Sequence, residues 1–230
     1  MKYILFLPLF LFAVLYAQTD PKAFEGVIEY QINVQSKSDK SKMFKDFFAQ
    51  KMILHIKENK IRCDYDSSGV DSLRLGYLLI LGDSNSVYRV MPQYQLIQRR
   101  HLSDLHETEQ VFSPEMYRSL ERKERVAGML CSMFMSEVNM PMGGGKARVI
   151  VSCADQLNFP VSGHLLEQST LMILGNGLRG IPLKKIMRFE EHDFEVTMTA
   201  VSISRQDISD EWYTLPQKYR IAKFNRISIY

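Results

Sequence analysis

Apolar and polar residues alternate along much of the chain, and this two-residue period predicts β-strands. In residues 24–34 the even positions from Ile28 to Val34 are apolar and the odd positions between them are polar. The pattern, or a short run rich in strand-forming residues, recurs at 52–56, 61–65, 77–81, 86–91, 94–98, 129–138, 147–153, 183–190 and 194–204. Many short strands separated by turn signals predict a mainly β fold, a curved antiparallel sheet or half-open β-barrel.

Three other stretches carry helical signals and predict a few helices that cover the sheet. Residues 41–51 place four apolar side chains on one side, and residues 113–123 begin with a Ser cap followed by Pro. Residues 165–174 end at Gly175-Asn176-Gly177, a typical helix stop. The chain has no internal repeat and no linker rich in Pro, Gly or Ser, so residues 18–230 are expected to form one domain.

The first 17 residues have the pattern of a signal peptide. Lys2 precedes an apolar run from Tyr3 to Tyr16, which is shorter than the ~20 residues that a membrane-spanning helix needs. Cleavage is expected after Ala17, and since the nearest cysteine is Cys63, no lipidated N-terminal cysteine is expected. The mature protein is therefore predicted to be periplasmic or secreted, monomeric and without a transmembrane segment.

Charge and motif content narrow the function classes. The chain has 29 Lys and Arg against 26 Asp and Glu, a net charge of +3 that gives no reason to expect a nucleic-acid partner. The five histidines are scattered, and no Walker or nucleophile-elbow motif is present. We therefore assign no catalytic residue, no metal site and no cofactor, and predict that the protein is not an enzyme.

Four short segments, in order, resemble the landmarks of a family of exported bacterial domains. They are the opening FEGVIEYQINV, the central ERVAGMLCSMFMSEV, GLRGIPLKKIM and the late ISDEWYTLPQKYRI. This family has the LolA-like fold, that of the periplasmic carrier of outer-membrane lipoproteins, and the resemblance implies a half-barrel with helices over its mouth. It implies no catalytic residue, because the family has no established activity. Met129 and Leu130 depart from the family pattern before Cys131.

Sulfur-bearing side chains in residues 129–153 form the main candidate site. Met129, Cys131, Met133 and Met135 are spaced by two, so in a strand they share one face. If Cys131 lies opposite Cys153 in a hairpin, Met133 lies opposite Val151 and Met135 opposite Val149. That register would allow a Cys131–Cys153 disulfide, which an oxidising compartment permits, and would leave Cys63 as a buried thiol.

Three interpretations of this face remain open: plain core, a ligand groove and a Cu(I) site. The expected function is non-enzymatic binding of an apolar ligand, a lipid or lipoprotein, in the concave face of the half-barrel. The candidate groove residues are Met129, Met133, Met135, Val149 and Val151. The alternatives are an interaction or scaffold module of the cell envelope with a fully packed core, and a soft-metal binder. The aromatic cluster from Trp212 to Tyr219 is expected to fasten the last turn across the sheet.

Overall fold

Twelve strands form one sheet in the computed structural model, which describes residues 23–36, 49–66, 76–101, 117–139, 145–159, 178–189, 191 and 193–223. The strands are β1 (Gly26–Ser36), β2 (Lys51–Lys57), β3 (Lys60–Asp66), β4 (Tyr77–Leu81), β5 (Ser86–Met91), β6 (Leu96–His101), β7 (Arg118–Val126), β8 (Met129–Asn139), β9 (Lys146–Ala154), β10 (Ile181–Phe189), β11 (Phe194–Ser204) and β12 (Arg220–Lys223). Their order in space is β12-β6-β5-β4-β3-β2-β1-β11-β10-β9-β8-β7. Neighbours are antiparallel except β12 and β6, which are parallel.

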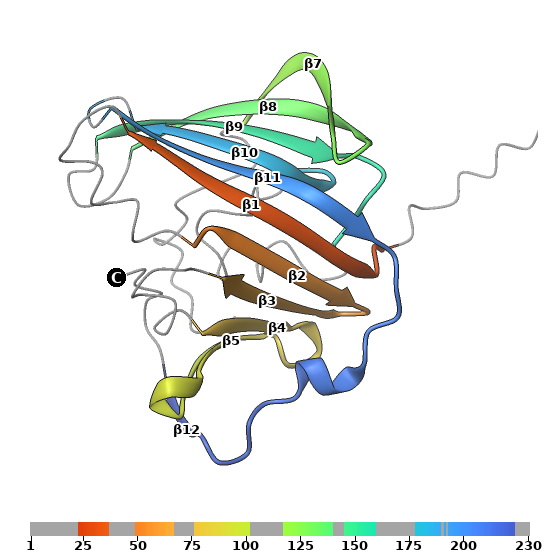
Figure 1. Ribbon diagram of the computed structural model, residues 1–230, viewed down its shortest axis with the longest axis vertical. Coiled ribbons are helices and arrows are strands. Elements are labelled where there is room, and N and C mark those ends of the chain that lie inside the picture. Colours follow the sequence, from red (N-terminus) through yellow and green to blue (C-terminus); the bar gives the residue numbers. More distant parts are fainter. Residues whose placement is uncertain are drawn as a thin grey trace, which may run out of the picture.

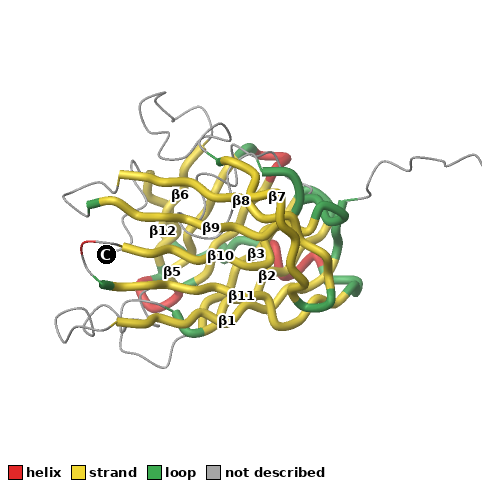
Figure 2. The backbone as a smooth tube through the Cα atoms, turned by 90° about the horizontal axis from the view of Figure 1, so that it is seen from above, coloured by secondary structure: helices red, strands yellow, loops and turns green. Residues whose placement is uncertain are grey.

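The sheet curves but does not close, since β7 and β12 lie at its two ends (Figure 1). Figure 2 shows the same arrangement from above, with β1, β11, β10 and β9 side by side. The prediction of a mainly β protein built on a curved antiparallel sheet is confirmed. Among the described residues no helix is long and apolar enough to cross a membrane.

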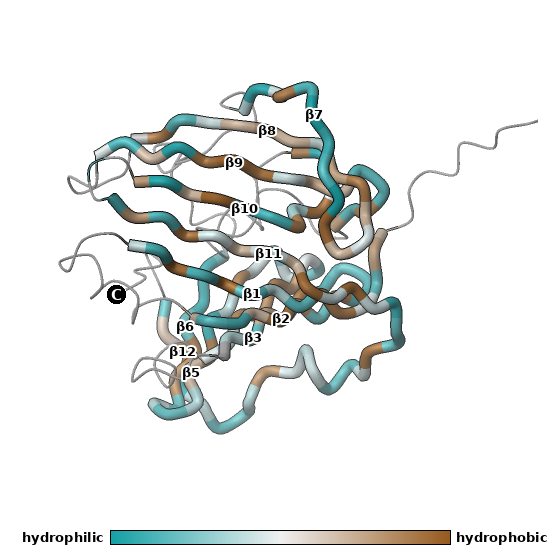
Figure 3. Tube along the Cα trace, turned by 45° about the horizontal axis from the view of Figure 1, so that its top comes forward, coloured by the Kyte–Doolittle hydropathy of each residue, from teal (hydrophilic) through white to brown (hydrophobic). Residues whose placement is uncertain are grey.

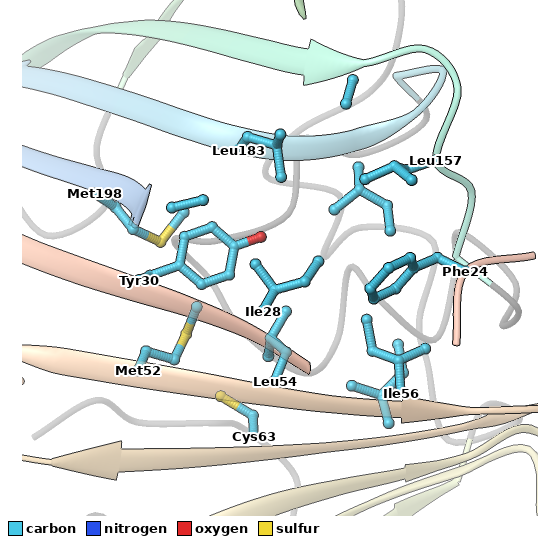
Figure 4. Close-up of a cluster of buried hydrophobic side chains, with 14 of the residues drawn as sticks. Phe24, Ile28, Tyr30, Met52, Leu54, Ile56, Cys63, Leu157, Leu183 and Met198 are labelled. Carbon is cyan, nitrogen blue, oxygen red and sulfur yellow. The ribbon is translucent and has the colours of Figure 1, made fainter. Parts of the chain in front are cut away.

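The two halves of the sheet face each other across a packed core on the concave side. Side chains from β10 and β11, such as Leu183 and Met198, point toward Met52 and Leu54 of β2 (Figure 4). Tyr30 of β1 is fully buried in this cluster. Its hydroxyl donates a buried hydrogen bond to the Pro182 carbonyl oxygen at 2.9 Å.

The segment after β11 crosses the convex face of β2–β6 as a strap, residues 205–219, before β12 joins β6 (Figure 1). Ile208 and Tyr213 of the strap are buried against apolar residues of β1, β4, β5 and β6, and Leu215 and Tyr219 pack at the margin. This half of the sheet is therefore buried on both faces, and the prediction that the last aromatic cluster packs across the sheet agrees with the structure.

A cluster of polar and aromatic side chains fastens the strap to β2 and β3. Arg62 makes a two-pronged ion pair with Asp64, with Nη2–Oδ1 at 2.8 Å and Nε–Oδ2 at 2.9 Å. It also donates to the Trp212 carbonyl oxygen at 3.2 Å and lies over the rings of Tyr77 and Trp212. His55 stacks on Trp212 with ring centroids 4.3 Å apart, and partial burial lowers the pKa of its imidazole. The Arg62 guanidinium thus joins two strands to the strap.

Replacing Arg62 with alanine is expected to loosen the strap and to lower the free energy of unfolding by about 1.5–3 kcal/mol, the range for a hydrogen-bonded charge. Arg62→Lys should recover only part of the lost stability, because lysine lacks the planar guanidinium that binds both carboxylate oxygens of Asp64. Urea unfolding and hydrogen exchange of residues 205–219 measure both effects. Arg188→Ala removes an exposed pair with Glu195 and should change stability by less than about 1 kcal/mol. An equal effect of the two alanine variants would contradict this role for Arg62.

One helical prediction was wrong and two fall largely outside the described residues. Residues 118–123 belong to β7, not to a helix. Pairing with β8 outweighs the local helix-start signal, and the charged residues of β7 suit an exposed sheet edge, which Figure 3 shows as hydrophilic. Residues 41–48 and 165–174 lie outside the described residues, while Lys51 begins β2. Within the described ranges the helical elements are short 3-10 turns, including η9 (Asp210–Tyr213).

Candidate functional site

The concave-facing side chains of β8, β9, β10, β11 and β1 form a continuous apolar layer that is largely buried. Directly paired residues on neighbouring strands share a face, so the registers define rows of side chains across the five strands. One row contains Phe134, Val151, Lys185, Met198 and Ile32. The next contains Ser136, Val149, Met187, Val196 and Val34. The residues of β9, β10 and β11 in these rows are buried, while Phe134, Ile32 and Val34 are half-buried at the two sides.

Lys185 is the exception in this apolar surface. It is only 3% exposed, and its paired neighbours on the same face are Val151 and Met198. Along β10, Leu183 and Met187 flank it on the same face. Burial lowers the pKa of its ammonium from 10.5 to about 7, and the nearby Cys153 has a smaller, opposite effect. A cation at this position is expensive to hold, because its charged form has lost most of its water.

A second buried polar group lies on the same face. Ser136 of β8 is 2% exposed, and its hydroxyl oxygen has no hydrogen-bond partner in the structure. It pairs with Val149, which in turn pairs with Met187, the residue two positions after Lys185. Ser136 and Lys185 are therefore two strands apart and offset by one step along the strand.

The adjacent Lys184 points to the opposite, convex face. Its ammonium donates to Glu124 Oε2 at 2.8 Å, and the other carboxylate oxygen of Glu124 accepts a short hydrogen bond from Ser152. Partial burial of Glu124 acts to raise its pKa, but these two hydrogen bonds outweigh burial, so the pKa of the carboxyl is lowered. This network ties β7 to β9 and β10 and leaves no charge unbalanced among its three members.

The three cysteines are buried thiols. Burial raises the pKa of the Cys63 and Cys153 thiols to about 12 and that of Cys131 to about 11. All three are therefore protonated at neutral pH, a state that neither attacks an electrophile nor binds a soft metal well. The expectation that Cys63 is buried in its strand is confirmed.

The predicted register of the β8–β9 hairpin was wrong by one residue. Ser132, not Cys131, lies opposite Cys153, and all three cysteines are free. The proposed Cys131–Cys153 disulfide depended on the two residues facing each other, so its structural basis is lost. The observed register places Glu137 opposite Arg148, with an ion pair at 3.4 Å, and Val138 opposite Ala147.

The shifted register also divides the predicted groove. Val149 and Val151 lie on the concave face as expected, but Met133 and Met135 are paired with Ser152 and Ile150 on the convex face. A one-residue change of register exchanges the two faces of a strand, which is the physical reason for the error. Met129 packs at the margin of the central core.

The shifted register keeps Met133 and Met135 on one face of β8 but places Cys153 on the other. The thioether of Met135 accepts a weak contact from the Arg118 guanidinium, with Nη2–Sδ at 4.0 Å, and this cation disfavours a metal ion there. In the part of the chain that the structure describes, no group of three or more His, Cys, Asp or Glu side chains is arranged to hold a metal.

Sequence reasoning missed Lys185, although the sequence contains a signal for it. In the strand Leu183–Phe189 the odd positions are Leu183, Lys185, Met187 and Phe189. A single charged residue among apolar residues at alternate positions of a strand indicates either a bulge or a buried charge with a special role. Choosing between these requires knowing which face of the strand is covered.

Comparisons with known proteins give no functional identification. No protein-family model matches the chain, and no curated protein sequence matches it. Among solved structures, the chain is similar to the crystal structure of an uncharacterized conserved protein from Thermus thermophilus, with a TM-score of 0.42 and 7% sequence identity. That similarity covers 89% of this chain and 93% of the Thermus chain.

Proposed function

We propose that this chain is an exported, non-enzymatic envelope protein that binds an apolar ligand, a lipid or a lipid-modified chain, on the concave side of its open sheet. The observation that carries the proposal is the apolar layer on the concave side of β8, β9, β10, β11 and β1, which is buried at its centre and half-buried at its margins. The half-buried side chains at its margins, Phe134, Ile32 and Val34, are where a ligand chain would make its first contacts. The signal-peptide pattern and the resemblance to the LolA-like family point in the same direction.

Transfer of the ligand's methylene groups from water would supply the affinity, at about 0.8 kcal/mol for each group buried. Binding of this kind forms and breaks no covalent bond. It also requires no change in the protonation of the described residues on the concave side. The groove residues differ from the sequence prediction: Val149 and Val151 remain, while Phe134, Met187 and Val196 take the place of the methionines of β8.

Organic extraction of the purified mature protein, followed by mass spectrometry, should recover a lipid. Calorimetric titration with oleyl alcohol, an uncharged long-chain amphiphile, then measures affinity directly. Ile32→Gln places a polar group on the concave face and is expected to weaken binding about tenfold, since burial of one apolar side chain supplies about 1.5 kcal/mol or more. Asn33→Gln changes the neighbouring, exposed residue of the same strand and should leave binding unchanged.

An empty extract together with no binding of oleyl alcohol by the folded wild-type protein would overturn the proposal. The alternative of a protein-interaction module would then be the better hypothesis. Circular dichroism of both variants confirms that a change in binding does not come from loss of the fold.

A further inference from the structure

Strand β12 has a free edge at one end of the sheet. Among the described strands it pairs with β6 alone and stands last in the sheet order (Figure 1). The Arg220 N–H donates to the Gln95 carbonyl oxygen at 2.9 Å, so the backbone of Arg220 faces β6. Successive residues of a strand turn their backbone groups to opposite sides, so the N–H and C=O groups of Ile221 and Lys223 face the free edge. Such an edge can pair with another strand.

The charges at this end of the sheet have one sign. The neighbouring strands β4, β5, β6 and β12 contain basic residues but no Asp or Glu. Lys223 is paired with Arg99, and both are exposed. Arg99 contacts neutral groups, the Ser86 hydroxyl and the Tyr88 ring, and within the described residues Arg220 and Lys223 have no ion-pair partner. Like charges on adjacent strands repel each other, so an anion bound beside them would be stabilising.

An exposed apolar side chain lies between the two cations of β12. Ile221 is 59% exposed, although its paired neighbour Ile97 on β6 is buried. Strand β12 therefore presents a cation, an apolar residue, the small Ala222 and a second cation in order. A complementary strand would have an acidic residue beside Arg220, an apolar residue beside Ile221 and an acidic residue beside Lys223.

The opposite edge of the sheet is protected against such pairing. Strand β7 is irregular between Ser119 and Lys123, and Glu121 within this stretch has a positive φ of 53°. Its charged residues are of both signs. Bulges and dense charges are common means by which natural sheets prevent pairing at an edge. The register of β12 with β6 is unbroken, and its charged residues are all basic.

We propose that β12 binds an acidic, extended segment of a partner protein, which joins the sheet as an additional strand. Hydrogen bonds to the backbone of Ile221 and Lys223 would hold the segment, and the side chains of Arg220 and Lys223 would select an acidic sequence. A second copy of this chain is a poorer match, because symmetric pairing of two β12 strands brings basic residues together. The site lies at the sheet edge, so it does not depend on the concave side or on the proposed function.

Fluorescence anisotropy of labelled peptides with the purified mature protein tests this inference. The probe repeats the order Glu-Val-Thr-Glu and is expected to bind at least about tenfold more tightly than the same peptide with Lys in place of Glu. Two further forms of the acidic peptide carry N-methyl groups on alternate backbone nitrogens, each form on a different edge of the peptide strand. Only one of them should lose binding, because an added strand bonds to β12 through one edge.

Variants of the protein locate the binding site. The double variant Arg220→Glu, Lys223→Glu should weaken binding of the acidic peptide by about tenfold or more. Arg122→Glu, Lys123→Glu makes the same change of charge on β7 and should leave binding unchanged. Ile221→Pro removes an N–H of the free edge and should also weaken binding, while the bond from Arg220 to Gln95 remains. Circular dichroism and hydrogen exchange of residues 220–223 check that β12 stays in the sheet.

Four results would overturn the inference. They are no binding of the acidic peptide, equal binding of the acidic and basic peptides, an equal effect of the two N-methylated forms, and an equal effect of the double variants on β12 and β7. Binding to phosphatidylglycerol vesicles without peptide binding would assign this edge to a membrane surface instead. A dimer that Ile221→Pro dissociates, again without peptide binding, would assign it to a second copy of the chain.

Discussion

Lys185→Met is expected to stabilise the ligand-free protein by roughly 2–4 kcal/mol at pH 7, because the gain from removing a buried charge exceeds the loss of the interaction that Lys185 makes. The folded state lowers the pKa of this lysine to about 7, against about 10.4 in an unfolded chain. Each unit of difference corresponds to about 1.4 kcal/mol of free energy that the folded protein loses by holding the charged form. Methionine has a similar length and no charge, so it fills the same space among Val151, Met187 and Met198 without this loss.

The lowered pKa of Lys185 also predicts how the stability difference between Lys185→Met and the wild-type protein depends on pH. Between pH 7 and about 10.4 the unfolded chain holds a proton on Lys185 and the folded protein does not, so stability of the wild-type protein rises with pH in this window. The advantage of Lys185→Met should therefore be constant below pH 7 and shrink as the pH approaches 10. Cys153, the titratable group beside Lys185 that contributes to its shift, has a pKa of about 12 and stays neutral throughout.

Urea unfolding of the wild-type protein and the variant at pH 6, 7, 8.5 and 10 measures this dependence. Lys184→Met is the control, because Lys184 is ion-paired on the convex face and its removal should not stabilise the protein. A destabilised Lys185→Met at pH 7, or a difference that does not change with pH, would show that the folded protein holds Lys185 without loss.

Tyr30→Ala is expected to destabilise the protein by about 3–5 kcal/mol, the usual range for removing a fully buried aromatic ring. The ring lies between Met198 and Ile28 in the central core (Figure 4), and its strand neighbour on β11 is the small residue Ala200. That small neighbour leaves room for the phenol to reach across β11 to the Pro182 carbonyl oxygen on β10. Tyr30 thereby joins three strands on the concave side.

Tyr30→Phe separates the ring from its hydroxyl and should cost about 1–3 kcal/mol, because it leaves the buried Pro182 carbonyl without this donor. Tyr94→Ala removes a tyrosine that is 54% exposed and should change stability by no more than about 0.5 kcal/mol. Thermal or urea unfolding of the three variants tests whether the loss of stability falls in the order Tyr30→Ala, Tyr30→Phe, Tyr94→Ala. A phenylalanine variant as stable as the wild-type protein would mean that the hydrogen bond to Pro182 contributes nothing.

The positions of most strands follow from local sequence. Strands β4, β5 and β11 have the predicted bounds, and β1, β2, β3, β8, β9 and β10 differ only at their ends. Alternation is a property of neighbouring residues, so a strand with one buried face is visible in the chain itself. Strand β7 was missed because its charged residues do not alternate with apolar ones. An edge strand can be exposed on both faces, and it is then held by hydrogen bonds to the neighbouring strand, which its own sequence does not reveal.

The set of side chains that faces the concave side could be identified only from the tertiary structure. Strand β8 has apolar residues on both of its faces, with Met133 and Met135 on one and Phe134 and Val138 on the other. Its own sequence therefore allows either face to turn inward, and the pairing with β9, which in turn pairs with β10, selects Phe134 and Val138. The sequence by itself determined the β class and the strand positions, because these depend on contacts between residues close in the chain. Only the tertiary structure decided that Lys185 lies buried on the concave side and that Met133 and Met135 face the other side, since this depends on strands that are distant in sequence and meet only in the folded sheet.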